Sequence, residues 1–193
     1  MYSLKDVKVI DPSIPVGRYT AIDLSESNRF LTEELISDTA VFELYIEDYL
    51  NKNNALVAYG GYNETRSLYR QNTIFKSGSA TERNRHIGLD LWIKAGTAVV
   101  AALDGRIHSF KENKAPGDYG PALILEHHIE SHVFYTLYGH LSRESLLSYK
   151  VGLSVKKGET IGSLGDASVN GGYAPHLHFQ IIKDLQGNFG DYP

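Results

Sequence analysis

Apolar residues within Asn28–Leu50 recur at three- and four-residue steps, the spacing of one face of an α-helix. The pattern predicts one helix with a break point near Ser37–Thr39, ending at the polar cluster Asn51–Asn54. Because an apolar stripe must be buried, we expect this helix to pack against the rest of the protein. A short strand over Ala55–Tyr59 and a helical turn over Asn63–Tyr69 are expected to follow.

Beyond residue 85 the pattern changes to short runs rich in Val, Ile, Leu, Tyr and Phe, separated by glycine turns. These predicted strands are Thr97–Leu103, Ala122–Glu126, His132–Tyr138 and His176–Ile182. Long helical patterns do not alternate with them, which favours a mostly antiparallel sheet. We therefore expect a mainly β protein with an N-terminal arm and helical extension over residues 1–80 and a β domain over 81–193. The run Lys76–Ala80 is a plausible linker.

Two segments of the chain are similar to each other in sequence. The segment Ile93–Val99 resembles Val155–Ile161, and each contains a Lys-x-Gly turn that leads into a strand. Such turns are common between strands, so two copies do not by themselves establish a repeat. The alternative is a sheet built from a duplicated strand-turn-strand unit, and the sequence leaves both readings open.

The composition excludes several classes of protein and of metal site. The 193 residues are 42% hydrophobic and 22% charged, which indicates a globular protein with a core. A net charge of -4 argues against a protein held mainly by nucleic acid or by an anionic membrane. Because cysteine is absent, disulfides, thiolate nucleophiles and cysteine zinc sites are excluded. Any metal must be held by His, Asp or Glu.

The chain has no apolar run of the roughly 18 residues that a membrane span needs. The N-terminus also lacks the apolar core of a signal peptide. We therefore expect a cytoplasmic location for the chain as given, and an extracytoplasmic one if it was trimmed from an exported protein.

The C-terminal segment contains a His-x-His pair. On a strand, alternation places Leu177, Phe179 and Ile181 toward a core and puts His176 and His178 together on the opposite face. One of these histidines could bind a metal while the other stands beside it. Alone, the pair is more typical of two solvated histidines on an edge strand than of a metal site.

A second group is His86-x-Gly-x-Asp90. A fully extended strand would hold its His and Asp about 13 Å apart, too far for one ion. Gly88 permits a bend or bulge that closes the gap. A buried His–Asp hydrogen bond is the simpler explanation of this motif taken alone.

Together the two groups supply His86, Asp90 and one of the two C-terminal histidines. Three protein ligands of this type leave the fourth position of tetrahedral zinc open, as in catalytic sites. His140 follows a predicted strand and Gly139, a position suited to pointing into a cleft. The motif His-Glu-x-x-His is absent, so no glutamate base of that kind is available.

The joint order of these motifs resembles the lysostaphin-type (LytM-like) zinc endopeptidases over about residues 85–182. The matching segments are His86-x-Gly-x-Asp90, Ala95-Gly96-Thr97, Asp104-Gly105, Tyr138-Gly139-His140-Leu141, Lys157-Gly158 and Pro175-His176-Leu177-His178-Phe179. Each piece is common, but the combination is highly specific. The region before residue 85 does not match this domain.

The resemblance implies one zinc per chain, held by His86, Asp90 and His178, with His140 and His176 acting on the water and the tetrahedral intermediate. It also implies an antiparallel sheet with a duplicated hairpin motif, and a peptide of the peptidoglycan stem or cross-bridge as substrate. Among the other residues, we expect His127 to have a packing or supporting role, Trp92 to lie in the core, and Tyr173 to line the cleft.

Two other classes stay open. The first is an intracellular or non-catalytic zinc-binding domain of the same fold. The second is a histidine phosphocarrier-like protein, which also brings two histidines into a cleft. Stoichiometric zinc would favour the metal site, whereas phosphorylation of one histidine by a partner would favour the carrier. The sequence does not predict the oligomeric state.

Overall fold

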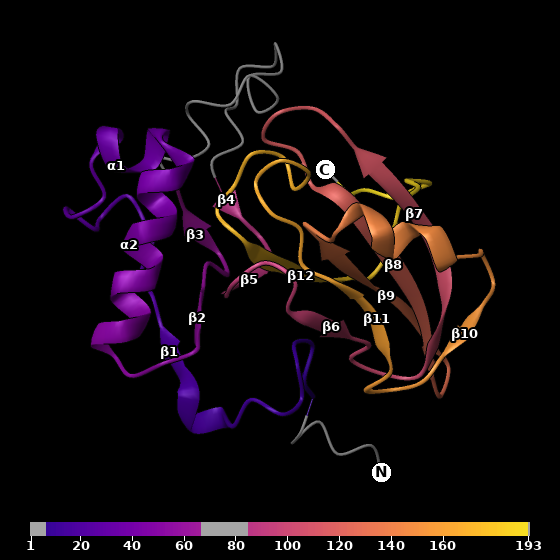
Figure 1. The fold of residues 1–193 in the computed structure, drawn as a ribbon. Coiled ribbons are helices and arrows are strands. Elements are labelled where there is room, and N and C mark those ends of the chain that lie inside the picture. Colours follow the sequence, from indigo (N-terminus) through magenta and orange to yellow (C-terminus); the bar gives the residue numbers. More distant parts are fainter. Residues whose placement is uncertain (1–6, 67–84, 193) are drawn as a thin grey trace.

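The computed structural model describes residues 7–66 and 85–192, and its main feature there is one large sheet of eight strands (Figure 1). These strands are β1 Tyr19–Ala21, β2 Val57–Gly60, β5 Leu89–Trp92, β7 Gly105–Asn113, β8 Gly120–Ile129, β9 His132–Gly139, β10 Ser154–Val155 and β12 His176–Ile182. Their spatial order is β1-β2-β5-β12-β9-β8-β7-β10. The pair β1–β2 is parallel, and the other neighbours in this sheet are antiparallel. The expectation of a mainly β, mostly antiparallel protein is confirmed.

The predicted helix is present and broken where the sequence indicated. Helix α1 spans Glu33–Ser37 and α2 spans Thr39–Lys52. Asp38 between them is extended, and its carboxylate accepts hydrogen bonds from the backbone N–H groups of Ala40 and Val41. An N-cap of this kind satisfies donors that have no partner within the helix, so Asp38 ends one helix and starts the next.

Helix α2 packs against the large sheet, as its apolar stripe predicted (Figure 1). Phe42 and Ile46 are both 4% exposed and cluster with Ala58 of β2 and Trp92 of β5. The rings of Phe42 and Trp92 meet edge to face with centroids 5.4 Å apart, a favoured aromatic geometry. Strands β1 and β2 also join the sheet through β5, so the N-terminal part shares a layer with the strands that follow it.

The two similar segments, Ile93–Val99 and Val155–Ile161, lead into the strands of a second, two-stranded sheet. Strands β6 (Ala98–Val100) and β11 (Thr160–Ser163) pair antiparallel with each other, and a bulge shifts the register near Ile161. Each follows a Lys-x-Gly turn whose glycine, Gly96 or Gly158, has a φ of +79° that side chains rarely adopt. The two similar segments thus have the same local form, a glycine turn that leads into a strand of one small sheet. The main core includes Val99 and Ile161 from these two strands together with Leu177 of β12.

One local expectation is wrong. The segment predicted as a helical turn over Asn63–Tyr69 begins instead with strand β3 (Glu64–Thr65), which pairs antiparallel with β4 (Arg85–His86). This pairing joins segments about 20 residues apart, a contact that local periodicity cannot reveal. The expected linker Lys76–Ala80 and the domain boundary between residues 80 and 81 lie outside the described residues.

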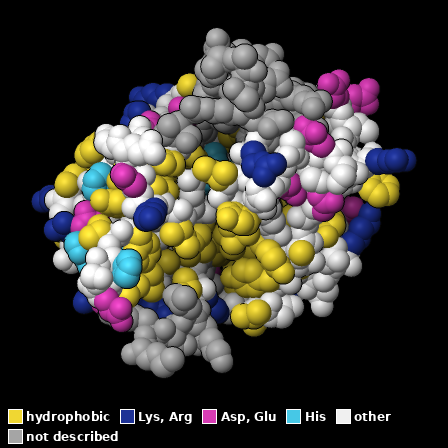
Figure 2. All heavy atoms as spheres, turned by 180° about the vertical axis from the view of Figure 1, so that it is seen from behind, with side chains coloured by type: hydrophobic (Ala, Val, Ile, Leu, Met, Phe, Trp, Pro, Cys, Tyr) yellow, Lys and Arg dark blue, Asp and Glu magenta, His cyan; other side chains and the backbone are white. Residues whose placement is uncertain are grey.

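In the view from behind, hydrophobic side chains gather across the middle of the face, and acidic and basic side chains are scattered around them (Figure 2). Among the described residues, no helix has the length and apolar content that crossing a membrane would require.

Candidate metal centre

His86 and Asp90 lie on either side of a break between β4 and β5. The pairing of β4 ends at His86, Ile87 and Gly88 belong to neither strand, and Asp90 lies in β5 opposite His178 of β12. The bend expected at Gly88 is therefore present. A Cβ atom at Gly88 would overlap Cε1 and Nε2 of His178, so this position must be glycine for the His178 ring to lie where it does.

Strand β12 presents both of its histidines on one face. Leu177 is fully buried and Phe179 packs against the main core, while His176 and His178 point to the other side. The prediction for Ile181 is wrong, since it is 68% exposed. The pairing of β12 with β5 ends at Phe179, so Ile181 lies beyond the neighbouring strand that would help to cover it.

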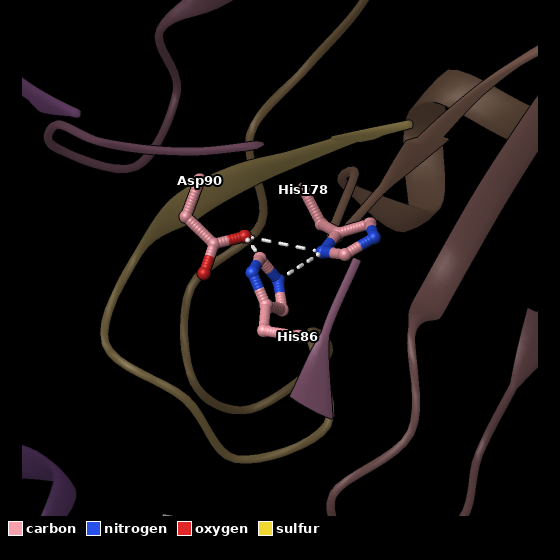
Figure 3. Close-up of side chains that lie close together, drawn as sticks. All are labelled: His86, Asp90 and His178. Carbon is pink, nitrogen blue, oxygen red and sulfur yellow. Dashed lines mark hydrogen bonds and ion pairs between the residues drawn. The ribbon is translucent and has the colours of Figure 1, made fainter. Parts of the chain in front are cut away.

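Three ligand atoms converge in Figure 3: Nε2 of His86, Oδ1 of Asp90 and Nδ1 of His178. The two nitrogens are 2.9 Å apart, and they lie 3.2 Å and 3.1 Å from the carboxylate oxygen. Ligands about 2.0–2.1 Å from a tetrahedral zinc are separated by about 3.3 Å. All three residues are at most 6% exposed. The triangle therefore has almost the dimensions that one zinc ion requires.

Neighbouring groups fix the ring protons on the far side of this triangle. Nδ1–H of His86 donates to the carbonyl oxygen of Gly61 at 2.8 Å, and Nε2–H of His178 donates to Oε1 of Gln180 at 3.2 Å. The lone pairs of the other two ring nitrogens then face each other and the Asp90 carboxylate. Such an assembly is stabilised by a divalent cation, and outer partners of this type are typical of metal-binding histidines. The residues therefore fit zinc.

The second oxygen of Asp90 is held by an arginine. Nη1 of Arg66 donates to Oδ2 of Asp90 at 2.5 Å, and both side chains are at most 3% exposed. Burial by itself raises the pKa of a carboxyl group, but the interactions with His86 and the Arg66 guanidinium outweigh it, and the pKa of Asp90 lies well below its usual range. Asp90 is thus an anion with Oδ1 directed at the triangle.

His140 and His176 lie beside the triangle, with ring centroids 4.2 Å apart. Their Nδ1–H groups donate to two carbonyls of one loop, that of Asn170 for His140 and that of Ala174 for His176, each at 2.8 Å. Both rings therefore present Nε2 as a lone pair, and Nε2 of His176 lies 3.9 Å from Oδ1 of Asp90. Burial lowers the pKa of His140 well below its usual value and that of His176 to about 4, so both are neutral at pH 7.

The backbone of His140 adopts a positive φ, which is uncommon for residues other than glycine. Its φ is +64°. The N–H of His140 donates to the Tyr119 carbonyl at 2.8 Å, and its carbonyl accepts from Gly165 N–H at 3.0 Å. Strained residues persist where the surroundings fix them, and they cluster at functional sites. The structure thus fixes the direction in which the His140 ring points.

Of the other residues named in the sequence analysis, Trp92 and His127 are buried, as expected. Trp92 is 2% exposed and stacks on His176 with ring centroids 4.0 Å apart. Tyr173 lies against His140, 5.2 Å between ring centroids. His127 is fully buried and bonded to Oγ1 of Thr136 and to the Asp104 carbonyl, a packing role.

Sequence reasoning missed three partners of the ligands: Gly61, Arg66 and Gln180. Strand alternation could have identified Gln180, because it lies two residues after His178 and so shares its face. Gly61 and Arg66 precede the family motifs and carried no comparable signal.

The buried neutral histidines predict a loss of stability in acid for the zinc-free protein. Burial lowers the pKa of His127, His140 and His176 relative to the unfolded chain, where histidine titrates near 6.5. Below pH 6.5 the unfolded state therefore binds protons that the folded state does not, and stability present above pH 6.5 is lost as pH falls toward 4. With a folded pKa of about 4, His176 alone would cost about 2 kcal/mol by pH 5.

Urea unfolding of the zinc-free protein at pH 7.5, 6.5 and 5 measures this loss, in a window above the range where most carboxyl groups titrate. A free energy of unfolding that does not change across the window would contradict the neutral assignment.

Comparison with known proteins relates the part of the chain that contains the triangle to a peptidase family. The profile of peptidase family M23 matches residues 84–189, more than half of the chain. An uncharacterized metalloprotease of Haemophilus influenzae is 36% identical over 96 residues, and the peptidoglycan DD-endopeptidase ShyC of Vibrio cholerae is 35% identical over 97. Each match covers 50% of this chain but only 18% and 20% of those relatives.

Among solved structures, the catalytic domain of lysostaphin from Staphylococcus simulans is 28% identical, and the match covers 71% of this chain and 86% of that one with a TM-score of 0.45. The matched family region contains all five predicted site residues, His86, Asp90, His140, His176 and His178. The chain belongs to peptidase family M23.

Proposed function

We propose that this chain is a zinc-dependent metalloendopeptidase that hydrolyses a peptide bond in the stem or cross-bridge peptides of peptidoglycan. The observation that carries the proposal is the buried triangle of His86 Nε2, Asp90 Oδ1 and His178 Nδ1, whose sides of 2.9–3.2 Å suit one zinc ion. The peptidoglycan substrate is supported by the similarity to the Vibrio cholerae DD-endopeptidase. When bound, zinc supplies a Lewis acid that activates water and polarises the scissile carbonyl.

The chain's own residues supply proton transfer and charge stabilisation. Nε2 of His140 and Nε2 of His176 are unprotonated at neutral pH, because burial lowers the pKa of both rings. Either atom can accept a proton from the attacking water and then, as N–H, donate to the developing oxyanion or to the leaving amine. The Asn170 and Ala174 carbonyls hold Nδ1 of each ring, so neither histidine can rotate without losing a hydrogen bond.

Incubation of the full chain with cross-linked peptidoglycan fragments, followed by mass spectrometry, tests this function. We expect one peptide bond to be cleaved when zinc is present, with activity lost on chelation and restored by added zinc. Zinc bound at about one per chain without cleavage of peptidoglycan peptides would contradict the proposal and favour the non-catalytic alternative.

A further inference from the structure

The partners that orient two of the three ligands come from a segment outside the matched family region. This segment, residues 60–66, contains the end of β2, the turn at Gly61, strand β3 and Arg66, whereas the family match begins at residue 84. It supplies the carbonyl that holds Nδ1 of His86 and the guanidinium that holds Oδ2 of Asp90. Two ligands from the family motif thus depend on one segment that precedes it, residues 60–66.

Strand β3 of this segment is fixed by backbone pairing to β4, the strand that contains His86. Glu64 of β3 lies opposite His86 of β4 in the ladder, so the register that places Arg66 also places the His86 ring. Gly61 has a φ of +99°, and a Cβ atom there would overlap Nη2 of Arg66 and lie 2.7 Å from Nδ1 of His86. The glycine therefore lets the turn approach both groups at once.

Arg66 is itself held from its other side. Its Nε donates to Oε2 of Glu64 at 2.7 Å, and Oε1 of Glu64 accepts from the backbone N–H of Leu24 at 3.1 Å. Glu64 is 13% exposed in its side chain and Arg66 is 3% exposed. A planar guanidinium held between two carboxylates has little freedom to rotate.

From these contacts we infer that Arg66 is a positioning residue for the zinc site, and that the segment 60–66 is part of the metal centre. By occupying Oδ2, Arg66 leaves Asp90 one oxygen, Oδ1, for the metal and fixes its direction. This keeps the carboxylate monodentate and preserves an open position. The inference rests on the proposed zinc site and adds to it a residue that the family motif does not contain.

Zinc affinity and the visible absorption spectrum of the cobalt-substituted full chain test this role, because neither depends on turnover. In Arg66→Met we expect the Kd for zinc to rise about 10- to 100-fold. The cobalt absorption should weaken as Asp90 gains freedom to bind through both oxygens. Arg66→Lys should recover part of the affinity, because it keeps the charge but not the planar fork.

Glu64→Gln provides a second variant if Arg66→Met fails to fold. It keeps Arg66 and weakens only the ion pair that holds the guanidinium from its other side. The Kd of this variant for zinc should lie between those of the parent and Arg66→Met. Arg106→Met is the matched control, because it removes an Arg–Glu pair of 2.5 Å between β7 and β8. Its zinc affinity should equal the parent's.

Folded Arg66→Met and Glu64→Gln proteins with the parent's zinc Kd and cobalt spectrum would overturn the positioning role alone. A parent chain that binds no zinc would overturn both this inference and the proposed function.

Discussion

His140→Ala and His176→Ala should each lower peptide hydrolysis by about 10²- to 10⁴-fold and still bind about one zinc per chain. Neither ring contributes an atom to the triangle formed by His86, Asp90 and His178, so removing it leaves the ligands in place. What is lost is a neutral Nε2 that can accept and return a proton. His178→Ala should behave differently and lose zinc and activity together.

Zinc content measured beside peptide hydrolysis for the three variants separates ligand from catalyst on strand β12. His132→Ala is the matched control, since His132 is exposed at the start of β9, and it should match the parent in both assays. If His176→Ala loses zinc as completely as His178→Ala, the division of roles within this strand is wrong. Unchanged hydrolysis in both His140→Ala and His176→Ala would contradict the catalytic assignment.

Gly88→Ala should weaken zinc binding by about 10- to 100-fold, although it changes no ligand. The added methyl group would overlap the His178 ring, which must move away from His86 and Asp90. Since the φ of Gly88 is not in the left-handed region, the effect should come from this overlap and not from backbone strain.

Gly17→Ala is the matched control for this substitution. A Cβ at Gly17 meets nothing within 4 Å, and its φ is also ordinary, so zinc affinity and the free energy of unfolding should stay near the parent's. A Gly88→Ala protein that binds zinc as tightly as the parent would show that the His178 ring is not confined as the structure indicates.

The fold was predictable where local pattern determines structure. The break before α2 follows from Asp38, which caps the next helix, and strand β12 follows from a run of alternating apolar residues. The duplicated turns were visible as Lys-x-Gly, because glycine is the residue that adopts their positive φ at low cost. The pairing of β6 with β11 could not be predicted, since sequence similarity between two segments does not specify which strands pair.

The site was predictable to the extent that its residues form motifs. His86, Asp90 and His178 come together because β5 and β12 are neighbours with Asp90 opposite His178. The roles of Arg66 and Gly61 could not be predicted, because the pairing of β3 with β4 brings them to the site. The periodicity of either segment alone does not indicate this pairing. The predicted burial of Ile181 was wrong for a similar reason, since the exposure of this residue depends on where the neighbouring strand β5 ends.

Anomalous scattering at the zinc absorption edge, from crystals of the full chain grown with zinc, tests the proposed metal site directly. We expect one strong peak per chain, about 2.0–2.1 Å from Nε2 of His86, Oδ1 of Asp90 and Nδ1 of His178. Nε2 of His140 and of His176 should lie outside bonding distance. No peak within this triangle, or a peak bound by other side chains, would contradict the account.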